Sequence, residues 1–170
     1  MTNTRRRAAV AAVAACLLLA APVLTACSND AESAAEQSVI DAVGGDVNLE
    51  SGGMDVTSSD GTQIQVGDDV TLPSNWPATM PTYEVGKLIS VMASGDLSTL
   101  NAIWTTDNSP DVAAAAYGDA LAKAGYAMVL GSDAGLFGGD YVGNGYSVNV
   151  VAVAGDDGTT VLMNAAKNTS

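Results

Sequence analysis

The chain has 170 residues, and its 19 acidic residues against six basic ones give a formal net charge of −13 at pH 7. A surface with that balance repels the phosphate backbone, which excludes nucleic acid as a partner. The chain contains no histidine, so the usual general base of a catalytic triad and the commonest metal ligand are both missing.

The first 26 residues have the parts of a bacterial export signal. Residues 5–7 are arginines, and residues 8–23 form an uncharged apolar segment of the length typical of a signal core. The sequence Leu-Thr-Ala-Cys at 24–27 then resembles a lipobox, whose cysteine receives a diacylglycerol before the chain is cut in front of it. This order favours a lipoprotein signal over an ordinary secretory signal or a retained membrane anchor. We therefore expect lipid on Cys27 to hold the protein on the outer face of the cytoplasmic membrane.

Cleavage before Cys27 limits the chemistry of the mature protein. The remaining 144 residues carry all 19 acidic side chains but only three lysines, and Cys16 leaves with the signal. Since lipid occupies the other thiol, a disulfide, a thiol nucleophile and a cysteine metal site are excluded. We expect no cofactor and no bound metal.

Two segments precede the main domain. Residues 27–35 are small and polar, which predicts a flexible tether. Residues 36–71 are expected to form a short helix, ended by two glycines at 44–45, and a small three-stranded meander. The sequence Asp60-Gly61 within it is typical of a tight hairpin. Such short strands are marginal alone, so we expect the meander to lean on the main domain.

Residues 72–83, with the sequence LPSNWPATMPTY, form a proline-rich strap. A proline recurs every four residues, which disfavours helix and predicts extended chain crossing a surface. Its apolar contacts would come from Leu72, Trp76 and Met80. The strap is either a docking segment for a partner or a belt packed on the protein's own core, and we favour the belt.

Residues 84–168 form the main domain. Two strand-like segments separated by Ser94-Gly95-Asp96 predict a hairpin, and a helix is expected from Ser109 and Pro110 to Gly125. Three more strands follow, so the order is β-β-α-β-β-β. This predicts an α+β fold with a mostly antiparallel sheet and one covering helix. The expected buried helix face comprises Val112, Ala116, Tyr117, Ala120, Leu121 and Ala124.

With the proline-rich strap included, the chain resembles uncharacterised secreted bacterial lipoproteins of the Gram-positive type. The resemblance rests on the lipobox, the sequence Gly-Gly-Asp-Val at 44–47, the pattern Leu-Pro-x-x-aromatic-Pro-x-x-apolar-Pro at 72–81, and the helix with Tyr117 and Leu121 before Ala-Gly-Tyr at 124–126. It spans nearly the whole mature chain. It implies a location and a fold type, but it assigns no catalytic residue.

Two groups of residues are candidates for function. The acid pairs 68–69 and 156–157 could serve as a general acid and base or bind calcium, but both lie in turn contexts, where aspartate is common. The glycine-rich segment 131–146 is either a loop that contacts a partner or a bulged strand or wide hairpin, and we favour the structural interpretation. The possible interaction surface comprises Trp76, Trp104, Phe137 and Tyr141.

These observations favour a non-catalytic binding or interaction module of the cell envelope. Its partner would be an envelope protein or a wall component, in addition to the membrane reached through lipid. The alternatives are a carrier of a small molecule or ion and an enzyme of unfamiliar type. A carrier should show an enclosed apolar pocket, an interaction module an open apolar patch, and an enzyme converging carboxylates with perturbed pKa values in a cleft.

Overall fold

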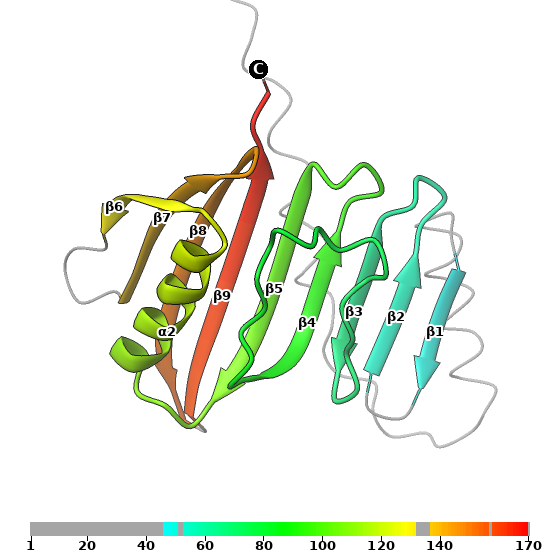
Figure 1. The fold of residues 1–170 in the computed structure, drawn as a ribbon. Coiled ribbons are helices and arrows are strands. Elements are labelled where there is room, and N and C mark those ends of the chain that lie inside the picture. Colours follow the sequence, from blue (N-terminus) through cyan, green and yellow to red (C-terminus); the bar gives the residue numbers. More distant parts are fainter. Residues whose placement is uncertain (1–45, 51–52, 132–136, 157, 170) are drawn as a thin grey trace, which may run out of the picture.

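The computed structural model describes residues 46–50, 53–131, 137–156 and 158–169. In this part of the chain, nine strands form one antiparallel sheet in the order β1-β2-β3-β4-β5-β9-β8-β7-β6, and one helix lies against it (Figure 1). The predicted class, an α+β fold with a mostly antiparallel sheet, is confirmed. Cys27, the tether and the helix predicted before residue 44 lie outside the described residues.

The first half of the sheet is a five-stranded meander. Its strands are β1 (Asp46–Glu50), β2 (Gly53–Thr57), β3 (Gln63–Gly67), β4 (Lys87–Ala93) and β5 (Thr99–Thr106). The predicted hairpin at Asp60-Gly61 is confirmed, because Gly61 has a φ of 82° and the Asp60 carboxylate accepts the Thr62 N–H. Strand β3 pairs with β4. The small meander is therefore continuous with the main sheet instead of leaning on it.

The second half follows the helix and is a four-stranded meander. Its elements are α2 (Pro110–Lys123), β6 (Ala127–Gly131), β7 (Phe137–Gly143), β8 (Tyr146–Gly155) and β9 (Gly158–Lys167). Four strands follow the helix instead of the three predicted, because the glycine-rich segment contains β7. Residues 137–146 of this segment form β7 and the turn into β8, as the structural interpretation predicted, and the bulge of the β6–β7 pair lies before the segment, between Met128 and Leu130. The last strand, β9, pairs with β5, which leaves β6 at the edge of the sheet.

Helix α2 begins and ends where the sequence predicted. Pro110 occupies its first turn, and Gly125 follows it with a φ of 90° while the Tyr126 N–H donates to the Leu121 carbonyl. The buried face differs from the prediction: Val112 is 49% exposed, and the helix buries Ala113, Ala114, Tyr117 and Leu121. The two largest side chains, Tyr117 and Leu121, lie one turn apart and set the face. Alanine occurs on every face of this helix, so the alanine positions did not indicate which face is buried.

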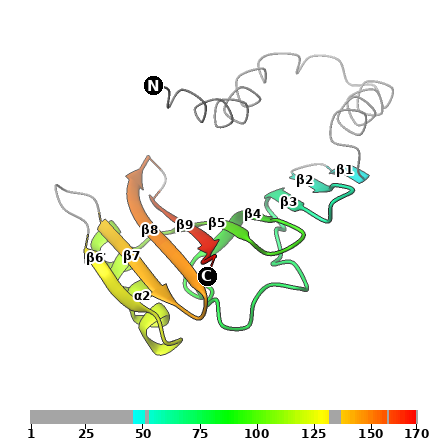
Figure 2. The same ribbon diagram turned by 90° about the horizontal axis from the view of Figure 1, so that it is seen from above.

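The proline-rich strap packs on the protein's own core, as the favoured interpretation predicted. Met80 and Tyr83 are 2% and 3% exposed, while Leu72 and Trp76 pack partly buried against the core. The strap and α2 lie on the same side of the sheet (Figure 2). The strap is not extended throughout, because two turns interrupt it. In these turns, the N–H groups of residues 76 and 80 donate to the carbonyls of residues 73 and 77.

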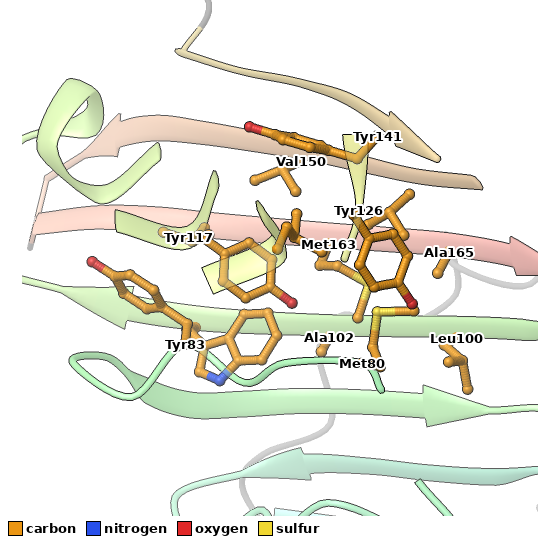
Figure 3. Packing of buried hydrophobic residues seen from close by; sticks show 14 of the residues in the cluster. Met80, Tyr83, Leu100, Ala102, Tyr117, Tyr126, Tyr141, Val150, Met163 and Ala165 are labelled. Atoms are coloured by element: carbon orange, nitrogen blue, oxygen red, sulfur yellow. The ribbon is translucent and has the colours of Figure 1, made fainter. Parts of the chain in front are cut away.

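An aromatic cluster joins the strap, the sheet and the helix. The rings of Trp104 and Tyr117 have centroids 5.4 Å apart, and Tyr83 meets Tyr117 edge to face at 6.0 Å. The Tyr117 hydroxyl donates to the Pro81 carbonyl at 2.9 Å. Figure 3 shows Tyr117 beside Tyr83 and Met163 within the buried layer. This cluster fixes the strap beside α2 and so defines one wall of a surface groove.

Candidate functional site

The structure brings together two of the four predicted interaction residues, because Phe137 and Tyr141 line the same groove. Trp104 is 2% exposed and belongs to the core, so the prediction that it contributes to an interaction surface is wrong, while Tyr141 is 3% exposed and contributes only as part of a groove floor. Trp104 points inward because it lies on the same face of β5 as the buried Leu100 and Ala102. Trp76 is partly buried and donates its indole N–H to the Met80 carbonyl. Phe137 is 40% exposed, so its side chain is accessible to a partner.

A groove lies on each side of helix α2, because most helix residues that face the neighbouring elements are alanine or glycine. The groove between α2 and the strap has a volume of about 690 Å³, and Trp76, Glu84 and Lys123 are among its lining residues. The groove on the other side, between α2 and the β6–β7 strand pair, has a volume of about 580 Å³. Both grooves are open to solvent, unlike the enclosed apolar pocket that we expected of a carrier.

The α2–β6 groove is the stronger candidate because it combines an apolar floor with acidic residues on the helix side. Its lining comprises Asp111, Ala114, Ala115, Gly118, Asp119 and Ala122 from α2, with Tyr126, Met128, Phe137, Gly138 and Tyr141 from beyond the helix. Gly118 permits the close approach of Tyr141 to the helix, since a Cβ atom there would lie 2.5 Å from the Tyr141 hydroxyl oxygen. The buried Tyr141 therefore forms part of the floor, and Phe137 and Met128 extend it to the surface.

Strand β6 forms the outer border of this groove and is exposed along its whole length. The side chains of Met128, Val129 and Leu130 are 56%, 61% and 61% exposed. In the described part of the chain, β6 pairs with β7 on one side and with no strand on the other. Met128 lies opposite Tyr141, on the helix side of the sheet, and Leu130 lies opposite Asp140. The edge thus offers apolar side chains together with an unpaired strand backbone.

The two edges of the sheet differ in their protection against strand pairing. Strand β1, at the far edge, carries the exposed acidic residue Asp46, and edge charges discourage pairing with another chain. Strand β6 has the sequence AMVLG, with neither a charge nor a proline. Its one blunting feature is the bulge between Met128 and Leu130. The edge beside the groove is therefore the less protected of the two.

The electrostatic character of the α2–β6 groove is negative. Asp111 and Asp119 line it, and neither a lysine nor an arginine is among its lining residues. The hydrogen bond from the Ser109 hydroxyl holds the pKa of Asp111 below its usual value. Burial, and secondarily the charge of Asp119, raises the pKa of Tyr141. A ligand of this groove would meet two carboxylates above an apolar floor.

The other carboxylates with lowered pKa values belong to exposed turns. A hydrogen bond from Lys87, whose ammonium lies 2.6 Å from the carboxylate, lowers the pKa of Asp68. Hydrogen bonds from Ser98 and Ser94 lower the pKa of Asp96 to about 2. An ion pair with Lys87 of β4 accounts for the shift at Asp68, and hydrogen bonds within a turn account for the shift at Asp96, so neither shift requires converging carboxylates. Asp157 of the second acid pair lies outside the described residues.

The opposite face of the sheet carries a polar row that the sequence analysis missed. Asn101, Asn164, Asn149 and Asp140 lie side by side on β5, β9, β8 and β7. Asn101 donates its side-chain amide to Asn164, and Asn149 donates to the Asp140 carboxylate at 2.7 Å. Each of these residues alternates with buried neighbours along its strand, and the sequence shows this alternation. Their positions side by side depend on the strand order, which the sequence does not show.

Among the described residues, no helix is long and apolar enough to cross a membrane. In the same part of the chain, no group of three or more aspartate, glutamate, histidine or cysteine residues is placed to hold a metal ion. Comparison with protein-family models, with curated proteins and with solved structures found no match for this chain.

Proposed function

We propose that this protein is an exported lipoprotein, anchored through Cys27 on the outer face of the cytoplasmic membrane, whose folded domain binds an envelope partner without catalysing a reaction. The observation that carries the binding role is the exposed apolar edge strand β6 beside the α2–β6 groove. Met128, Val129 and Leu130 are each more than half exposed there, with Met128 on the helix side of the sheet and Leu130 opposite Asp140. An exposed apolar edge strand of this kind is a ready template for pairing with another chain.

The proposed anchor is supported by the sequence alone. The arginines at 5–7, the apolar core and the sequence ending in Cys27 occur in the order of a lipoprotein signal. Two acyl chains on one residue are enough for stable attachment, whereas one chain gives marginal binding. The mature chain is strongly acidic, so the anionic membrane surface would repel the folded domain and leave its grooves accessible.

The anchor is tested by fractionation of cells that produce the full-length protein. We expect the wild type in the membrane fraction, and mass spectrometry should find the mature N-terminus at residue 27 carrying acyl groups. The Cys27→Ala variant should have neither the lipid nor an N-terminus at residue 27, because the cut follows lipidation. A wild-type protein with an uncut leader, or with a bare thiol at residue 27, would contradict the proposed anchor.

The binding role is tested by site-specific photocrosslinking in intact cells. A photoreactive amino acid replaces Val129 in β6 or, as a control, Ser59 in the β2–β3 turn, and both positions are exposed. We expect a defined crosslinked species from position 129 and none from position 59. Its loss on substitution of the neighbouring Met128 by lysine would locate the contact. Equal crosslinking from both positions, or none from either, argues against a binding role for this edge.

A further inference from the structure

We propose that the α2–β6 groove binds an extended, cationic segment of a partner protein, which adds to the sheet as a strand beside β6. This inference rests on the proposed binding function and names the chemistry of the partner. It follows from three features of the same surface: an unpaired strand backbone, an apolar floor, and two carboxylates on the adjacent helix. Each feature restricts what could occupy the site.

The unpaired edge selects an extended polypeptide. An added strand forms main-chain hydrogen bonds with an exposed edge, which gives affinity independent of the partner's side chains. Strand β6 offers five residues, a length of about 17 Å at the usual rise of a strand. The bulge between Met128 and Leu130 interrupts regular pairing, so the added strand would be short.

The groove selects the side chains that this segment carries on the helix side. Alternate residues of an added strand point to opposite faces of the sheet. Those on the helix side enter the α2–β6 groove, where Met128, Phe137 and Tyr141 provide apolar contact and Asp111 and Asp119 provide negative charge. Lysine and arginine match both properties, because their aliphatic stems cover apolar surface while the cationic group reaches a carboxylate.

Charge also decides against a second copy of this chain as the occupant. The mature chain carries 19 acidic residues against three lysines. Pairing two β6 strands would bring two α2–β6 grooves together, each with Asp111 and Asp119 and without a lining cation. Like charges brought together at an interface disfavour association. A cationic partner removes this repulsion.

The inference is tested with purified full-length protein in a non-ionic detergent and two synthetic peptides. One peptide has the sequence Thr-Arg-Val-Arg-Val-Arg-Val-Arg-Thr, and the other has glutamate in place of each arginine. We expect the arginine peptide to bind and to slow amide hydrogen exchange in residues 127–131, measured by mass spectrometry. The glutamate peptide should do neither. Raising the salt concentration should weaken binding of the arginine peptide, because the charges are exposed to solvent.

Two double variants, each with the same change in net charge, test the role of the groove. Asp111→Asn with Asp119→Asn should weaken binding about 2- to 30-fold, since each exposed charge pair contributes about 1.4- to 5-fold. Asp55→Asn with Asp69→Asn changes carboxylates that line a different hollow, and binding should stay close to wild type. Equal weakening by the two double variants would mean that net charge, and not the groove, attracts the peptide, which would overturn the inference.

Four further results would overturn it. They are equal binding of both peptides, binding of the arginine peptide without protection of residues 127–131, binding of cell-wall glycan fragments in place of either peptide, and concentration-dependent dimerisation abolished by Met128→Lys. If photocrosslinking from Val129 succeeds in cells while the arginine peptide fails, the proposed binding function stands and the cationic strand is wrong. If both fail, the binding function fails with it.

Discussion

The hydroxyl of Tyr117 allows a prediction with two parts that can be measured on one variant. This hydroxyl donates to the Pro81 carbonyl at 2.9 Å, and the side chain is fully buried. Replacing Tyr117 by phenylalanine removes the hydrogen bond and leaves the ring contacts in place. A hydrogen bond of this kind contributes about 1 kcal/mol to stability. The Tyr117→Phe variant should therefore unfold about 3–5 °C below the wild type near neutral pH.

The second part concerns alkaline pH, where the Tyr117 hydroxyl destabilises the fold instead of stabilising it. Burial raises the pKa of Tyr117 well above its usual value, so the folded protein keeps a proton that the unfolded chain releases above about pH 10. Linkage then destabilises the wild type by about 1.4 kcal/mol at pH 11 through this residue alone. The phenylalanine variant lacks this ionisable hydroxyl, so this contribution to the pH dependence is absent from it. The two stabilities should become equal between about pH 10 and pH 11 and reverse above that range.

The assay is urea unfolding of the full-length protein, monitored by tryptophan fluorescence at pH 8, 10 and 11. Trp104 reports on the site directly, because its ring lies 5.4 Å from that of Tyr117. Equal stabilities at pH 8 would show that the hydroxyl contributes nothing to the attachment of the strap. A stability difference that is the same at pH 8 and pH 11 would refute the argument that burial suppresses ionisation of Tyr117.

Two further predictions concern the backbone and acidic pH. Gly138→Ala should cost more than about 2 kcal/mol, because its φ is 141° and the new Cβ would lie 2.0 Å from the Val150 carbonyl oxygen. Gly145→Ala, with a φ of 80° and no atom within 4 Å, should cost about 1–2 kcal/mol, and equal costs in urea unfolding would contradict the steric argument. The Asp96 carboxyl should titrate at about 2 in a carbon NMR titration, because Ser98 donates to it. Its stabilising effect is then present above the unfolded-state pKa of about 3.9 and lost as pH falls through about 2, whereas titration near 4 would exclude the bond.

The local features of the fold could be predicted from the sequence because neighbouring residues determine them. Asp60-Gly61 forms a turn by its own backbone preferences and its own side-chain hydrogen bonds. Pro110 and Gly125 mark the ends of α2 for equally local reasons. The order of the sheet could not be predicted, because it depends on pairing between β5 and β9, which lie more than 50 residues apart in the chain.

The candidate site depended on that long-range pairing. The segment Ala127–Gly131 was recognisable as a strand, but only the sheet order makes it an edge. The burial of Trp104 follows from the alternation of β5, and the burial of Tyr141 follows from the space that Gly118 leaves under α2. An aromatic residue in a polar or glycine-rich context therefore did not indicate exposure. Phe137 alone of the four predicted residues combines groove lining with an exposed face.

The pairing of β5 with β9 also governs when the sheet can close. Residues 158–167 leave the ribosome, or any N-terminus-first translocation pore, after all the other strands. Until they arrive, β5 and β8 each have an open edge, and the two meanders have no strand between them. A chain that stops before residue 158 would thus expose the unpaired backbone edges of β5 and β8. Such truncated products should aggregate or be degraded, even though most of their turns can form.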